Sequence, residues 1–211
     1  VQNFGFMTFV FNSIIVIGFA MVSQVILCSV CAFVISRKLS KRAGQFVLLF
    51  FLGGMMVPFA SIMLPQLIMY REMGAYNNYA ALLLPFLYPY GFYVYLYKGF
   101  FDQIPGSYFE AAELDGAGSF YLYTRICMPL SKPIISLIAL QTFIGNWNDF
   151  FWAWLVTEDQ KLWTLNVALY NISNNVATKQ NALMGLAVVT ITPVILLSIL
   201  FSKQLKQSIV A

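Results

Sequence analysis

The sequence has no histidine, only three cysteines, and charged side chains at just 9% of its 211 positions. The absence of histidine removes the commonest metal ligand and general base of proteins. Cys28 and Cys31 have the CxxC spacing of redox and metal motifs, but they lie inside an apolar run, whereas that chemistry needs a polar, accessible thiolate. We therefore expect no metal site, no catalytic residues and no disulfide framework.

The sequence also has too few charged residues for the surface of a soluble domain, and no basic stripe that would bind nucleic acid. Soluble domains carry about 25% charged residues, and a chain that is 60% hydrophobic cannot cover a water-facing globule with the few charges it has. The net charge of +4 is modest, and the basic residues stand at the ends of apolar runs rather than in a stripe. The chain is therefore not expected to bind nucleic acid. No G-x-x-x-x-G-K-[ST] loop is present, so the chain is not expected to bind ATP itself. No other cofactor is expected.

Long apolar stretches dominate what is present, and the mean hydropathy is +0.77. Each of five stretches is long enough for a bilayer-spanning helix, which needs about 20 residues. They do not alternate apolar and polar residues as barrel strands do, so we predict an all-α, polytopic transmembrane helix bundle forming one domain over residues 1–211. Prolines should kink some of these helices, and neighbouring helices must then cover the freed backbone groups. The predicted spans are residues 13–35, 46–70, 80–97, 134–156 and 183–201.

The distribution of lysine and arginine predicts the orientation, because cytoplasmic loops carry an excess of both. Alternate loops carry nine basic residues on one side and three on the other, so the nine-rich side should be cytoplasmic. The chain's first residue, Val1, then lies outside. An omitted upstream span would repair this, and we expect six spans in the full protein. The first basic group on the cytoplasmic side is Arg37, Lys38, Lys41 and Arg42.

The predicted cytoplasmic loop, residues 99–132, is too long for a tight turn. Ser107 and Glu110 have the S-x-x-E spacing of a capping box, which satisfies backbone donors at the start of a helix. Good helix formers follow at Glu110, Ala111, Ala112, Glu113 and Leu114. The loop is therefore expected to contain a short helix.

The end of this short helix is predicted at Asp115-Gly116, because glycine readily adopts the left-handed conformation that follows a helix. Ser119 is expected to cap a second short helix through Ile126. The loop should thus form two short helices, with a glycine bend between them, at the membrane surface.

These loop residues carry a resemblance to a known family. The spaced residues Glu110-Ala111-Ala112, Gly116, Ile126 and Met128-Pro129 resemble the EAA signature, E-A-A-x3-G-x9-I-x-L-P, of bacterial ATP-binding-cassette importer permeases. Only Met128 departs, standing where leucine is usual. Trp147-Asn148-Asp149-Phe150 resembles the W-N-D-F of the carbohydrate branch, in its maltose-type, second-permease subgroup, and the resemblance extends over nearly the whole chain.

The resemblance implies a multi-pass permease subunit in the bacterial plasma (inner) membrane, within the lipid bilayer. The expected partners are two ATP-binding subunits, which bind and hydrolyse the ATP, a second and different permease subunit, and an extracytoplasmic solute-binding protein. The first loop helix would be the coupling helix that docks into the ATP-binding subunit. Local chemistry offers another reading, in which Glu110 only caps a helix and Gly116 only ends it, and the two roles can coexist. The coupling residues carried over are Glu110, Ala111, Ala112, Leu114, Asp115, Gly116 and Pro129.

A second group of candidate residues lies in the predicted fourth span. An ionised carboxylate such as that of Asp149 is costly in a bilayer unless it faces water or a partner. Asn146, Trp147, Asn148 and Asp149 are therefore candidates for the lining of a substrate pathway, and the resemblance implies a sugar as the substrate. Two other readings stay open: an interhelical hydrogen-bond cluster and, for the tryptophan, an interfacial aromatic belt.

Two other classes of function are weaker alternatives. A secondary transporter or channel that is not driven by ATP would suit the proline-broken helices, but it leaves the loop signature unexplained and no internal repeat is visible. A membrane-embedded enzyme would need a base or metal cluster, which a chain without histidine and with an isolated Asp149 does not offer.

Overall fold

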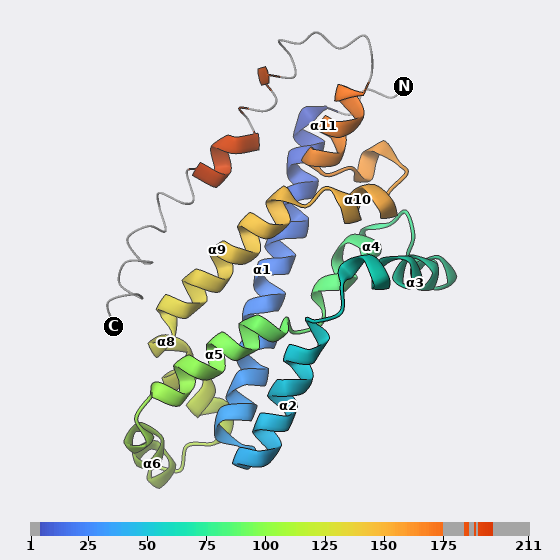
Figure 1. Ribbon diagram of the computed structural model, residues 1–211. Coiled ribbons are helices and arrows are strands. Elements are labelled where there is room, and N and C mark those ends of the chain that lie inside the picture. Colours follow the sequence, from blue (N-terminus) through green and yellow to red (C-terminus); the bar gives the residue numbers. More distant parts are fainter. Residues whose placement is uncertain (1–4, 175–183, 186–187, 189, 196–211) are drawn as a thin grey trace. The chain divides into compact units, whose positions relative to one another are not determined.

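The computed structural model describes residues 5–174, 184, 185, 188 and 190–195, and every element among them is helical (Figure 1). The all-α prediction is confirmed for this part of the chain, as expected for a backbone that must satisfy its own hydrogen bonds in lipid. In chain order the helices are α1 (Phe6–Arg37), α2 (Lys41–Gly54), α3 (Phe59–Glu72), α4 (Tyr79–Leu83), α5 (Gly91–Gln103), α6 (Gly106–Leu114), α7 (Ser119–Tyr121), α8 (Met128–Leu130), α9 (Lys132–Asn148), α10 (Phe151–Val156) and α11 (Leu165–Ser173). Shorter elements are 3-10 turns at Leu84–Phe86 and Gln160–Leu162 and a π-helical segment at Leu122–Cys127.

Two stretches of the described chain are long and apolar enough to cross a membrane alone. They are α1, with 32 residues, and Tyr79–Gln103, with 25 residues. These contain the predicted spans 13–35 and 80–97. The number rises to four if each of two bent helix pairs, α2 with α3 and Ser119–Leu130 with α9, forms one span.

The remaining predicted spans are interrupted or lie elsewhere. The span predicted at 46–70 breaks between α2 and α3, where Pro58 disfavours a helical conformation in the residue before it. The span predicted at 134–156 was expected to be one helix, which is wrong, because α9 ends at Asn148 and α10 begins at Phe151. The fifth, 183–201, falls mostly outside the described residues.

The chain divides into two compact units, and the loop helix α6 belongs to the one formed by Val22–Pro58 and Leu87–Ala139. Its core gathers buried apolar side chains from α1, α5, α6 and the π-helical segment. Gly91 brings α5 against α2 so closely that a Cβ atom there would overlap the carbonyl group of Phe51. Figure 1 shows α6 as a short helix beyond the end of α5.

Gln24 of α1 covers the helix break that precedes α5. Its side-chain amide donates to the carbonyl of Tyr88 at 2.9 Å, and its side-chain oxygen accepts from the backbone N–H of Tyr90 at 3.1 Å. Between them stands Pro89, which has no N–H to donate. The prediction that a neighbouring helix covers backbone groups freed near a proline is confirmed at this break.

The other unit comprises, among described residues, residues 5–21, Phe59–Phe86 and 140–174, with part of the stretch after residue 183. One of its apolar clusters surrounds Trp152, which stands edge-on to Tyr70 with ring centroids 5.7 Å apart. A second cluster surrounds Trp147.

Candidate functional site

The start of α6 is set by proline rather than by a capping serine. Pro105 occupies the N-cap position, and its carbonyl accepts the backbone N–H of Tyr108 at 3.3 Å. Ser107 lies inside the first turn, and no side chain caps this end of the helix. The capping box predicted for Ser107 and Glu110 is therefore wrong.

The end of α6 follows the prediction closely. Asp115 is the C-cap residue, and Gly116 has a φ of +83°. The N–H of Gly116 donates to the carbonyl of Glu113 at 3.0 Å, and the N–H of Ala117 donates to the carbonyl of Ala112 at 2.9 Å. This pair of bonds is a Schellman motif, which satisfies carbonyls that the helix itself leaves free.

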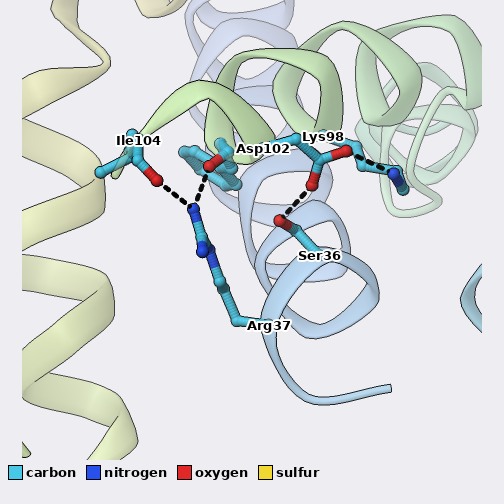
Figure 2. A network of polar contacts seen from close by, with 6 residues as sticks. Ser36, Arg37, Lys98, Asp102 and Ile104 are labelled. Atoms are coloured by element: carbon cyan, nitrogen blue, oxygen red, sulfur yellow. Dashed lines mark hydrogen bonds and ion pairs between the residues drawn. The ribbon is translucent and has the colours of Figure 1, made fainter. Parts of the chain in front are cut away.

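The inner side of α6 is held by an aromatic ring and an arginine. Phe109 is only 7% exposed and packs into the core of its unit, while Ala112 is half-buried beside it. The guanidinium of Arg37, the last residue of α1, lies 4.0 Å from the centroid of the Phe109 ring. The same guanidinium donates to the backbone carbonyls of Phe101 and Ile104, the latter at 2.9 Å. Figure 2 shows the bond to Ile104.

A carboxylate next to this arginine joins α1 to α5. The hydroxyl of Ser36 donates to Asp102 at 2.6 Å, and the ammonium of Lys98 forms an ion pair with the other oxygen of Asp102 at 2.6 Å (Figure 2). The i,i+4 spacing of Lys98 and Asp102 is visible in the sequence, whereas the contact with Ser36 joins residues 66 positions apart.

The outer side of α6 is exposed and carries both acidic and apolar groups. Leu114 is 89% exposed, the most exposed of the large apolar side chains in the described residues. Phe120, just beyond the glycine bend, is 79% exposed. Such side chains on a fixed helix are suited to contact with another protein. The exposed residues of the helix and its C-terminal bend include Glu110, Ala111, Glu113, Leu114, Asp115 and Gly116.

The second half of the loop is longer than predicted. The helical stretch expected to run from Ser119 to Ile126 continues to Leu130, and its middle is π-helical. Within the π-helical segment the hydroxyl of Tyr123 lies 2.7 Å from that of Ser29 on α1. Pro129 is exposed in the short helix α8 that follows.

The candidate pathway residues lie where α9 stops. Asn148 and Asp149 are exposed and Asn146 is half-buried, whereas Trp147 is buried and its indole N–H donates to the carbonyl of Thr190 at 2.8 Å. Asp149 stands immediately before Phe150, the N-cap residue of α10. An acidic residue before an apolar run is a helix-start signal, and it explains why the predicted continuous helix breaks here.

The sequence did not indicate the structural role of Asn12, which organises the stretch between α10 and α11. Its side chain is 1% exposed and donates to the carbonyls of Lys161 and Trp163, at 2.8 and 2.9 Å. It also accepts a hydrogen bond from the hydroxyl of Tyr79. The neighbouring Ser13 accepts the N–H of Leu165 at 2.9 Å. A polar Asn-Ser pair at the start of an apolar run was the available signal.

Comparison with known proteins agrees with these features. The family described as the binding-protein-dependent transport system inner membrane component matches residues 24–209. The chain is 31% identical to the probable ABC transporter permease protein YurM of Bacillus subtilis (strain 168), over 95% of this chain and 67% of that protein. It is 27% identical to the diacetylchitobiose uptake system permease protein NgcG of Streptomyces coelicolor (strain ATCC BAA-471 / A3(2) / M145), over 94% of this chain and 66% of that protein.

A solved structure shares the fold. It belongs to a bacterial ABC transporter involved in the import of the acidic polysaccharide alginate, and the match has a TM-score of 0.78 with 24% identity over 94% of this chain and 74% of that one. The helices and the matches together define a membrane-embedded permease. The chain belongs to the family of binding-protein-dependent transport system inner membrane components. It spans about two thirds of the length of the two relatives.

Proposed function

We propose that the chain acts as the transmembrane permease subunit of an ATP-driven importer, with α6 as its coupling helix. The observation that carries the proposal is the construction of α6: nine residues with a defined start and end, anchored on one side by Phe109 and exposing Leu114 on the other. The EAA pattern falls on this helix and its bend. Family membership favours this reading over an ion-driven transporter or a channel.

The coupling role follows from the rigidity of the helix. A short helix with fixed ends transmits a rigid-body displacement, whereas a flexible loop would absorb it. Two ATP-binding subunits would hydrolyse ATP. One of them would bind α6, and the other would bind the corresponding helix of the second permease subunit. The contact set would be Glu110, Ala111, Ala112, Leu114, Asp115, Gly116 and Pro129, of which all but the half-buried Ala112 are exposed.

For the substrate, we infer a sugar received from an extracytoplasmic solute-binding protein. The name of NgcG as a diacetylchitobiose permease supports this class, as does the resemblance of residues 147–150 to the carbohydrate branch. Asn148 and Asp149 are exposed at the end of α9, and Asn146 lies within the same helical turn, so this end of the helix would contribute polar groups to the pathway. Trp147, which is buried, would hold this end of α9 in place. The chain would cross the bacterial inner membrane five times, and the full protein six.

The test is capture of the ATP-binding subunits by the assembled permease pair. Leu114→Asp should reduce their co-purification at least about tenfold, since burying a leucine at an interface is worth about 1.5–3 kcal/mol. Leu39→Asp, at a leucine that is 36% exposed in the turn between α1 and α2, is the matched control and should leave co-purification unchanged. Normal recovery with Leu114→Asp would contradict the coupling assignment.

The energy source and substrate class need a separate experiment. A thermal-shift screen of the solute-binding partner against mono-, di- and oligosaccharides identifies the sugar for an uptake assay in proteoliposomes. Uptake should require ATP in the lumen that faces the ATP-binding subunits and should persist when ion gradients are collapsed. Uptake driven by an ion gradient without ATP would instead support a secondary transporter.

A further inference from the structure

Three helices meet at the side chain of Arg37. The arginine ends α1, and its guanidinium donates to two backbone carbonyls at the end of α5, those of Phe101 and Ile104; Figure 2 shows the bond to Ile104. The same planar group lies over the ring of Phe109 on α6. The last carbonyls of a helix have no partner within it, and a cation at that end is favoured by the helix dipole. Arg37 is half-buried, so these contacts are partly shielded from water.

We propose that Arg37 is a positioning residue that locks the coupling helix α6 to α1 and α5, so that a displacement of α6 is carried into both helices. This inference rests on the proposed function, in which α6 receives the motion of the ATP-binding subunit. Arginine suits the role because one rigid, planar group can donate to two carbonyls and stack on a ring at the same time. A lysine ammonium offers no plane to stack.

The neighbouring polar contacts do not replace this lock. Ser36 and Lys98 both meet Asp102, which joins α1 to α5 but does not reach α6. Lys38 does reach Glu113 on α6, but that pair is 4.0 Å apart and largely exposed, and exposed ion pairs of this kind contribute little. Loss of the Arg37 side chain should therefore loosen α6 on α1, leaving only the apolar packing of Phe109 and Ala112, while α1 and α5 stay joined.

Two distances measured by pulsed electron paramagnetic resonance separate these cases. The first joins spin labels at Ser107 on α6 and Val34 on α1, and the second joins Val34 to Tyr95 on α5, all at exposed positions. The sample is the full importer with its ATP-binding subunits in lipid nanodiscs, without nucleotide and with ATP and vanadate. The native cysteines Cys28, Cys31 and Cys127 are replaced by alanine.

In the parent protein, which keeps Arg37, both distance distributions should be narrow and unaffected by ATP and vanadate. In Arg37→Ala the Ser107–Val34 distance should broaden and should shift by at least ~2 Å on addition of ATP and vanadate, the scale of helix movements at interfaces. The Val34–Tyr95 distance should stay narrow. Arg42→Ala, at an exposed arginine in the first turn of α2, is the matched control and should behave like the parent.

A nucleotide-dependent shift is a response that a purely structural loss of stability would not produce. A Ser107–Val34 distance in Arg37→Ala that is as narrow and unresponsive as in the parent would overturn the proposal, and so would equal shifts in Arg37→Ala and Arg42→Ala. If the ATP-binding subunits do not co-purify with the parent at all, the proposed function fails instead. The widths measured without nucleotide still test the lock in that case.

Discussion

Gly116 is the position in the loop where a single methyl group should have the largest local effect. Its φ of +83° lies in the left-handed region, which costs an ordinary L-residue roughly 1–2 kcal/mol. Alanine also restricts the opened chain, which offsets roughly 0.4–1 kcal/mol of that cost. The net loss for Gly116→Ala is about 1 kcal/mol, or about fivefold in the equilibrium for opening the helix end.

Hydrogen exchange measures this opening directly. The amide of Ala117 is bonded to the carbonyl of Ala112 in the Schellman motif, so its exchange rate should rise about fivefold in Gly116→Ala. Gly118→Ala is the matched control, because Gly118 has a φ of −78° and open space around a Cβ atom, and it should leave the rate unchanged.

The choice of side chain separates backbone strain from simple bulk. Asparagine tolerates the left-handed conformation better than alanine or valine does. Gly116→Asn should therefore exchange more slowly than Gly116→Ala, although asparagine is larger, and Gly116→Val should exchange fastest. The affinity for the ATP-binding subunits should fall in the order Gly116→Asn, Gly116→Ala, Gly116→Val, because the apparent affinity scales with the fraction of molecules in which the helix end is formed. Effects that rise with side-chain size alone, or equal effects at Gly116 and Gly118, would refute the reasoning.

Two further substitutions test the packing of each unit. Gly91→Ala should destabilise the protein by about 1–3 kcal/mol, because the added methyl group meets the backbone of Phe51. Gly99→Ala, in the same helix but with open space around the Cβ atom, should be neutral or stabilising. In thermal unfolding in detergent, Gly91→Ala should have the lower melting temperature, and the reverse order would contradict the close approach of α2 and α5. Asn12→Leu should cost about 2 kcal/mol, because it removes the hydrogen bonds of three partly buried groups, the carbonyls of Lys161 and Trp163 and the hydroxyl of Tyr79. It should also speed proteolysis between α10 and α11. Unchanged melting and cleavage would show that the cluster is dispensable.

Local chemistry predicted the features that depend on neighbours in the chain. The end of α6 at Gly116 was predictable because a left-handed glycine after a run of helix formers needs only local bonds. The start of α6 was mispredicted because Pro105, with its fixed φ, competes with the serine for the cap. The break at Asp149 was mispredicted because hydropathy alone reads through a single polar residue, which here stands immediately before the N-cap residue of α10.

Features that depend on distant contacts could not be predicted. Arg37 entered the sequence reasoning only as one positive charge, and its partners Phe101 and Ile104 lie 64 and 67 positions away. Asn12 reaches a carbonyl 151 positions away. Nothing in the spacing of an apolar run indicates which polar residue will find such a partner.

The central claim is that the exposed face of α6 meets an ATP-binding subunit. A photo-crosslinking amino acid at Leu114, in the intact importer in native membranes, tests it most directly when the covalent product is identified by mass spectrometry. A product with the ATP-binding subunit is expected from the probe at Leu114, and none from the same probe at Leu39. Capture of an extracytoplasmic protein, or of no ATP-binding subunit at all, would contradict it.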